Sequence, residues 1–150
     1  INFIWLNKIT FYEPFLLTHH QTSWTDIGDY DGPVHYPGKI IPDKAFEKIE
    51  DEELKDNLRW GAKVFTKDSL EQRILKPVRF AEERGLPVYC GEWGCYKAVP
   101  DEPLLRWYAD VRSIFEEHDI GWTIWDYKGG FGIKSPEGEV YEDLLKVLTE

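Results

Sequence analysis

Residues 87–92 read PVYCGE, a short apolar run of the kind that forms a buried β-strand. The segment before it has apolar residues at every fourth position, namely Leu70, Ile74 and Val78. That spacing predicts a helix, with Asp68 as its cap, Pro77 as a bend and Gly85 just beyond its end. A helix that leads directly into a buried strand indicates an α/β protein.

The same alternation continues toward both ends of the chain. Residues 3–12 (FIWLNKITFY) are rich in aromatic and β-branched side chains, which predicts a strand that Pro14 ends. Residues 121–127 (GWTIWDY) predict a third buried strand. Two further helices are expected over residues 101–115 and 139–148. The order is therefore strand, helix, strand, helix, strand, helix.

A long segment separates the first strand from the first of these helices. Residues 13–42 are rich in glycine and proline and predict a loop, and long loops inside compact domains tend to bind ligands. Residues 43–60 are densely charged with a broken apolar stripe, which predicts a short helix with a solvated face.

Strands that alternate with helices form parallel sheets, and long loops after the strands are typical of (β/α)8 barrels, whose chemistry lies on that face. Eight such units usually take about 250 residues. The 150 residues of this chain therefore predict a single domain over residues 1–150 that forms a partial TIM barrel of about three β/α units with parallel strands. The sequence contains no Met, and we expect the chain to be cut from a longer one.

The composition excludes several classes of protein. With 42% hydrophobic and 15% aromatic residues, the chain has enough apolar material for a core and is not intrinsically disordered. A formal charge of −10 opposes binding to nucleic acid or to an anionic membrane. No apolar run approaches the roughly 20 residues of a membrane helix, and Ile1–Leu6 lacks the basic lead of a signal peptide. Cys90 and Cys95 are expected to be buried hydrophobes, with no metal or cofactor.

Three polar or aromatic residues end the three predicted strands. Tyr12 ends the first, Glu92 the second and Trp125 the third. Side chains alternate along a strand, so we expect Cys90 and Glu92 to share a face and Glu92 to project into the barrel mouth. An indole stacks on the apolar face of a sugar, and a carboxylate stabilises or attacks an oxocarbenium-like centre. Taken alone, Glu92 is most simply a solvated charge, Trp125 a core residue and Tyr12 a half-buried packing residue. Because all three lie at the ends of predicted strands, sugar chemistry is the favoured interpretation.

A family resemblance rests on three segments. Residues 11–24 (FYEPFLLTHHQTSW), 87–97 (PVYCGEWGCYK) and 120–133 (IGWTIWDYKGGFGI) resemble, in order, the sixth, seventh and eighth strand regions of glycoside hydrolase family 5 cellulases. The resemblance spans nearly the whole chain. It implies a (β/α)8 barrel, retaining hydrolysis of β-1,4-glucans or related β-glycans without a cofactor, and an extracellular or periplasmic location.

The resemblance also implies roles for single residues. Glu92 falls on the catalytic nucleophile, Tyr12 on the tyrosine that hydrogen-bonds it, and Trp125 on the tryptophan that stacks on the sugar. Weaker candidates for substrate contacts follow the strands and are Trp24, His19 and Lys128. For His19, an ordinary loop histidine is an equally good interpretation. The sugar itself is not fixed by these residues.

The sequence departs from the family pattern in two places. Thr10 stands where the family usually has histidine, and a hydroxyl cannot carry a positive charge beside the carboxylate. The acid/base glutamate of the family lies in an Asn-Glu pair on the fourth strand, for which the 150 residues have no counterpart. Glu13 and Asp126 are the available substitutes, but both neighbour inward-facing residues and should point to the opposite face.

These observations leave more than one function open. The first is the carboxyl-terminal part of an endoglucanase, inactive alone because its acid/base and much of its cleft lie outside, with the missing amino-terminal part as partner. The second is a non-catalytic glycan-binding or self-assembling module. Unpaired strand edges and an exposed lumen then predict a homodimer or larger oligomer. A fragment without a function of its own is the third.

Overall fold

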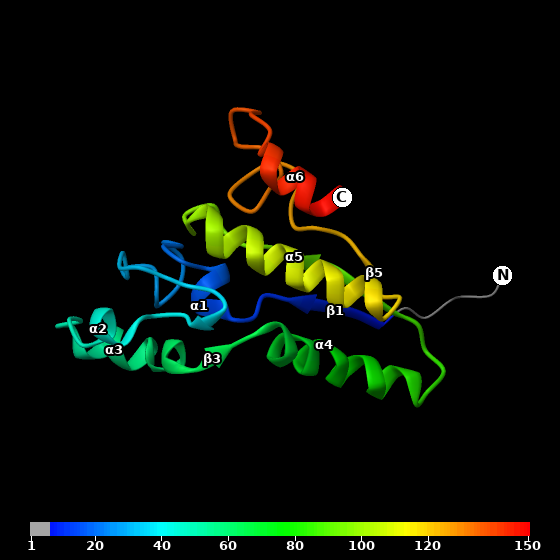
Figure 1. The fold of residues 1–150 in the computed structure, drawn as a ribbon, viewed down its shortest axis with the longest axis horizontal. Helices are drawn as coiled ribbons and strands as arrows, with labels where there is room; N and C mark the ends of the chain where they lie inside the picture. Colours follow the sequence, from blue (N-terminus) through cyan, green and yellow to red (C-terminus); the bar gives the residue numbers. More distant parts are fainter. Residues whose placement is uncertain (1–6) are drawn as a thin grey trace.

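The computed structural model describes residues 7–150 and places a three-stranded parallel sheet at their centre (Figure 1). The strands are β1 (Asn7–Phe11), β4 (Val88–Trp93) and β5 (Gly121–Trp122), in the order β1-β4-β5. Residues 3–6 of the first predicted strand lie outside the described part. Parallel pairing of all three strands agrees with the expected partial barrel.

The predicted strand over residues 121–127 is paired as a strand only at Gly121–Trp122. The chain nevertheless follows β4 further, because the Thr123 amide donates to the Cys90 carbonyl and the Trp125 amide to the Trp93 carbonyl, both at 2.8 Å. The carboxyl end of the third segment therefore stays beside the carboxyl end of β4.

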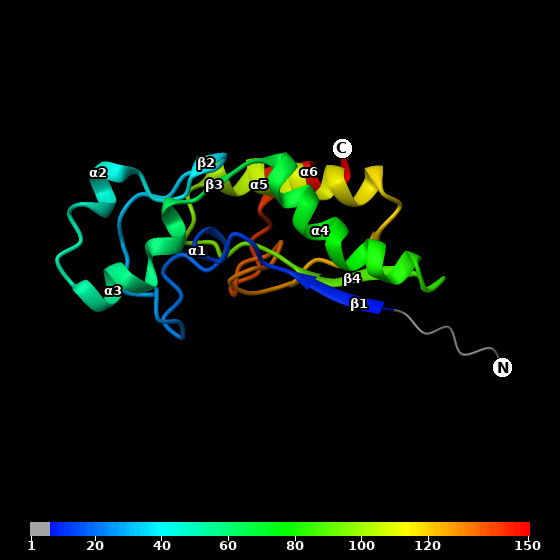
Figure 2. The same ribbon diagram turned by 90° about the horizontal axis from the view of Figure 1, so that it is seen from below.

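Three helices cover one side of the sheet. They are α4 (Lys67–Glu82), α5 (Asp101–Glu117) and α6 (Glu142–Thr149). Figure 2 shows them on the same side of β1 and β4, and no helix of residues 7–150 lies on the other side of these strands. Within the described residues, none of the helices has the length and apolar character needed to cross a membrane.

The predicted cap of α4 is wrong. Thr66, not Asp68, precedes the helix: its hydroxyl accepts from the Ser69 amide at 3.3 Å, and the Ser69 hydroxyl accepts from the Thr66 amide at 2.9 Å. This reciprocal pair is a capping box, and Asp68 lies in the first turn, where a carboxylate still favours the helix dipole. Pro77 lies inside α4 as expected.

The long segment between β1 and α4 is more structured than expected. It contains α1 (Phe15–Thr18), the antiparallel pair β2 (Gly38–Lys39) and β3 (Val64–Phe65), α2 (Asp43–Phe46), α3 (Glu52–Asn57) and the 3₁₀ helix η1 (Arg59–Ala62). The single helix predicted over residues 43–60 is therefore wrong. It is interrupted because the Asp51 carboxylate accepts from the amides of Glu53 and Leu54 and starts a new helix there.

The core lies between the sheet and the helices. Trp93 at the end of β4 is fully buried against rings of α5, with centroids 5.9 Å from Trp107, 5.3 Å from Tyr108 and 5.2 Å from Phe115. Aromatic burial of this kind is among the largest single contributions to a core. The helices thus fix the end of β4 from one side and leave its other side free for chemistry.

Candidate functional site at the carboxyl ends of the strands

An irregularity in β4 determines where Glu92 points. The register pairs Ile9 with Cys90 but Thr10 with Glu92, so Gly91 is an extra residue, as in a β-bulge. Cys90 is fully buried in the core on the helix side, whereas Glu92 reaches Lys8 on the uncovered side. The expectation that Cys90 and Glu92 share a face is therefore wrong, because the extra residue resets the alternation.

Glu92 forms an ion pair on the open face of the sheet. The Lys8 Nζ donates to the Glu92 Oε1 at 2.7 Å, and the side chains are 56% and 29% exposed, respectively. Thr10 is also exposed, from the same strand and the same face as Lys8. The carboxylate is therefore open to solvent rather than buried beneath the helices.

Tyr12 follows β1 and is half-buried between two rings. Its ring centroid lies 5.2 Å from that of His19 and 5.9 Å from that of Phe131, both edge to face. Burial, and after it the charges of Glu92, Cys90 and Asp126, raise the pKa of Tyr12 well above its usual value. The phenol is thus a hydrogen-bond donor at neutral pH. Within residues 7–150 the expected hydrogen bond from Tyr12 to Glu92 is not formed.

The backbone of Trp125 lies beside the end of β4, and its side chain is exposed. The side chain is 48% exposed, and its amide is anchored to the Trp93 carbonyl. Gly94 permits this approach, because a Cβ at that position would lie 2.2 Å from the Trp125 carbonyl oxygen. An exposed, anchored indole is suited to stacking on a sugar ring.

The loops after the three strands are joined to one another. The Tyr96 amide donates to the Thr18 carbonyl and the Lys97 amide to the Gly130 carbonyl, both at 2.8 Å. The rings of His19 and Phe131 meet at 5.3 Å. The residues that follow β1, β4 and β5 therefore form one continuous surface at the carboxyl end of the sheet.

The three weaker candidates lie in two of these loops. His19 stacks on Phe15 at 3.9 Å, its Nδ1 lies 2.9 Å from the Thr18 hydroxyl, and burial lowers its pKa to about 4, so it is neutral at pH 7. Trp24 is 62% exposed and meets Tyr96 edge to face at 5.4 Å. Lys128 is exposed in the loop after β5.

The two substitute acids lie in different surroundings. Glu13 pairs with Arg73 of α4, so it turns toward the helices as expected. Asp126 has one buried carboxylate oxygen without a hydrogen-bond partner in the described part of the chain. A Cβ at Gly132 would lie 2.8 Å from that same oxygen, which places the Asp126 side chain against the glycine-rich turn. Glu13 is therefore held in an ion pair, and Asp126 is packed against its own turn.

A cavity of about 560 Å³ lies beside Tyr12, at the free edge of β1. Its walls combine aromatic and apolar side chains with the Glu13–Arg73 pair, and they include Phe15, His19, Trp60 and Phe65. Glu92 and Trp125 are not among its lining residues. Residues 7–150 hold no group of His, Cys, Asp or Glu arranged for a metal ion, and both cysteines are buried free thiols.

Sequence analysis did not single out Lys8, Tyr96 or Phe131. Lys8 was detectable, because Lys8, Thr10 and Tyr12 are spaced two apart in the predicted strand and so share a face. The contacts of Tyr96 and Phe131 depend on how two loops meet, and no local spacing indicates that.

The chain is similar in sequence and in fold to known glycoside hydrolases. No family model matches the sequence. Endoglucanase C from Acetivibrio thermocellus is 31% identical over 147 residues, which cover 93% of this chain and 39% of that protein. The solved structure of a glycoside hydrolase has a TM-score of 0.71 at 29% identity, over 95% of this chain and 41% of that one. The solved structure of endoglucanase Cel5A from the hyperthermophilic Thermotoga maritima has a TM-score of 0.65 at 19% identity, over 94% of this chain and 38% of that one.

These relatives confirm both the expected family and the expected fold, a part of a TIM barrel with three parallel strands. The chain spans 39% of the length of endoglucanase C. By sequence it is a homologue of endoglucanases, and by fold it is similar to the carboxyl-terminal part of family 5 cellulases, which are TIM-barrel glycoside hydrolases.

Proposed function

We propose that this chain carries the nucleophile side of a retaining β-1,4-glucanase site, with Glu92 as the nucleophile. The observation that carries the proposal is the position of Glu92 on the open face near the end of β4, the strand that lies between β1, which leads to Tyr12, and β5, which leads to Trp125. In a (β/α) barrel, this end of the strands is where catalytic groups collect. The names of the endoglucanase relatives support a β-glucan as substrate.

In this reaction a Glu92 carboxylate oxygen bonds to the anomeric carbon of the glucosyl unit while the glycosidic bond breaks. The departing oxygen takes a proton from a general acid, and water then releases the sugar from Glu92. Trp125 stacks on the sugar, and the Tyr12 hydroxyl, which keeps its proton at neutral pH, is available to donate to the carboxylate. Trp24, His19 and Lys128 line the approach.

The general acid comes from outside this chain. A retaining site needs its two carboxyls about 5 to 5.5 Å apart. Glu13 is held by Arg73 on the helix side, and Asp126 packs against its own turn. We therefore expect little or no hydrolysis by the isolated chain, and activity once a separately expressed amino-terminal portion of the barrel docks on it.

The decisive variant is Glu92→Gln in the reconstituted barrel, assayed for release of reducing sugar from a soluble β-glucan. Loss of the nucleophile should lower kcat by roughly 10³-fold or more. Glu82→Gln is the matched control, because Glu82 is exposed on α4, and it should hydrolyse at the unaltered rate. Unchanged turnover by Glu92→Gln would remove Glu92 from the mechanism.

A non-catalytic glycan-binding module is the second candidate. Several aromatic side chains are strongly exposed near the strand ends, including Trp24 at 62%, Trp60 at 65% and Tyr127 at 62%. Exposed rings of this kind bind sugar faces without any chemistry. Calorimetric titration with cello-oligosaccharides that shows binding, together with a reconstituted barrel that releases no product, would favour this function over the enzyme.

A further inference from the structure

One cation lies against the proposed nucleophile. Lys8 Nζ donates to Glu92 Oε1 at 2.7 Å across the β1–β4 pair, and both side chains reach solvent on the open face. The other Glu92 oxygen, Oε2, accepts no hydrogen bond within residues 7–150. Because the hydrogen bond from Lys8 fixes the position of Oε1, it also fixes the direction in which Oε2 points.

The backbone of β4 is built to admit this lysine. Lys8 is paired with Tyr89 in the register, so its side chain must run along β4 to reach Glu92. A Cβ at Gly91 would lie 2.3 Å from Lys8 Cε and 2.9 Å from Cδ. Glycine at the extra position therefore leaves the space through which the Lys8 chain passes.

The other titratable groups near Glu92 do not neutralise its charge. Tyr12 follows β1 and Cys90 lies on β4 itself; burial raises the pKa of Tyr12, and raises that of Cys90 to about 11. Both are neutral at pH 7, and Asp126, which follows β5 and lies near Tyr12, adds negative charge. Thr10, opposite Glu92 in the register, has a hydroxyl where the family resemblance expects a histidine.

We propose that Lys8 is a positioning residue for Glu92, supplying the positive charge that Thr10 cannot and turning the free carboxylate oxygen toward the sugar. This role rests on the proposed function of Glu92 as nucleophile. The ion pair restricts the rotation of the carboxylate, which is the preorganisation that a nucleophile needs.

The contact itself is tested on the isolated chain with a water-soluble carbodiimide. The reagent activates the Glu92 carboxylate, the Lys8 amine displaces it as a urea, and the resulting amide leaves the protein lighter by one water. Peptide mass spectrometry should find the Lys8–Glu92 cross-link. Gly91→Ala should lower its yield by displacing Lys8, whereas Gly121→Ala, whose Cβ would meet Tyr89 at an ordinary 3.4 Å, should not. Absence of the cross-link in the unaltered chain would overturn the proposal.

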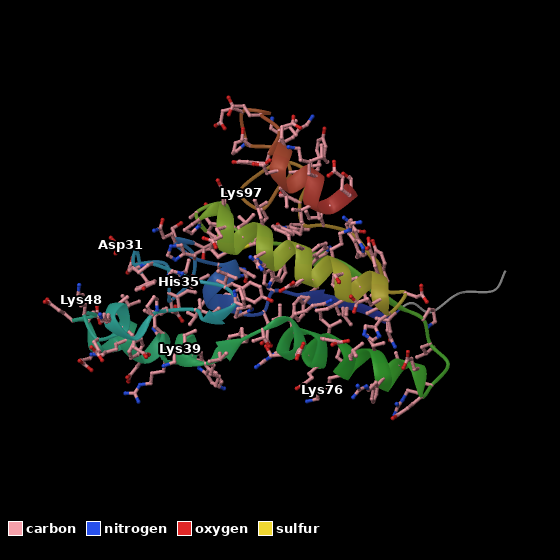
Figure 3. The ribbon with its side chains drawn as sticks, in the orientation of Figure 1. Asp31, His35, Lys39, Lys48, Lys76 and Lys97 are labelled. Carbon is pink, nitrogen blue, oxygen red and sulfur yellow. The ribbon has the colours of Figure 1, made fainter. Side chains whose placement is uncertain are left out.

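The contact is tested in a second way on the same chain by adding glycinamide, which competes with the Lys8 amine for the activated Glu92 carboxylate. Lys8→Met removes the competing amine and should raise the yield of glycinamide on Glu92. Lys76→Met is the control, because Lys76 is exposed on α4 (Figure 3), and it should leave that yield unchanged. Equal coupling in Lys8→Met and the unaltered chain would contradict the contact.

The consequence for catalysis is measured in the reconstituted barrel. Lys8→Met should lower kcat by about tenfold and leave KM within about twofold, with Lys8→Arg restoring most of the rate. A Lys8→Met enzyme with an unaltered kcat would refute the positioning role while Glu92 stays essential. If Glu92→Gln is instead active, the proposed function fails, and the cross-link still decides whether the contact exists.

Discussion

At the scale of single residues, His19 gives the molecule a pH-dependent stability. Its pKa is lowered to about 4 by burial, against about 6.5 in an unfolded chain. Because the folded state favours the neutral ring, this stability is complete above pH 6.5 and is lost as the pH falls toward 4. The loss is at most about 3 kcal/mol, less the effect of solvent that reaches the ring.

Urea unfolding at a series of pH values checks this prediction. His19→Gln should flatten the fall in unfolding free energy between pH 6.5 and 4. Part of the slope should remain, since burial also lowers the pKa of His20. His35→Gln should keep the whole slope, because His35 is exposed. An unaltered slope in His19→Gln would show that its ring titrates alike in both states.

Residue identities at the strand ends were predictable from sequence, but the direction of Glu92 was not. Simple alternation put it on the face of Cys90, and the extra residue at Gly91 reversed this. A bulge depends on pairing with a distant strand, so a local pattern does not reveal it. Whether Tyr12, Glu92 and Trp125 act as proposed remains a prediction.

At the scale of elements, the start of α4 depends on its capping box. Thr66→Ala removes the hydroxyl that accepts from the Ser69 amide and should lower the free energy of unfolding by about 1 kcal/mol. Asp68→Ala removes only a first-turn charge and should cost a few tenths of a kcal/mol, about the lower limit for such charges. Urea titration of both variants compares them directly. A larger loss in Asp68→Ala would restore Asp68 as the main contributor at this helix start.

Elements with a long apolar period were the most predictable ones. The helices over 67–82 and 101–117 and the strand over 88–93 lie close to their expected positions. The segment over 43–60 was not predictable, because its break depends on the Asp51 side chain competing for backbone amides. The third strand was overextended, since its continuation is held by single hydrogen bonds to β4 rather than by a ladder.

At the scale of the whole molecule, the sheet has helices on one face and none from residues 7–150 on the other (Figure 2). β1 and β5 are its two edges, and unpaired edges and exposed rings favour association. We expect the isolated chain to form a homodimer or larger oligomer that buries the open face, and light scattering across a concentration series measures this.

The same unpaired edges predict that the amino-terminal portion of a barrel binds in preference to a second copy of the chain. The amino-terminal portion of a barrel offers strands complementary to both edges, whereas a second copy offers the same edges again. Adding that portion should therefore convert the oligomer into a one-to-one complex. A carbodiimide too large to enter the closed lumen should then no longer cross-link Lys8 to Glu92. If light scattering shows that the chain stays monomeric, both alone and with the amino-terminal portion added, the prediction that the open face associates with a partner would be wrong.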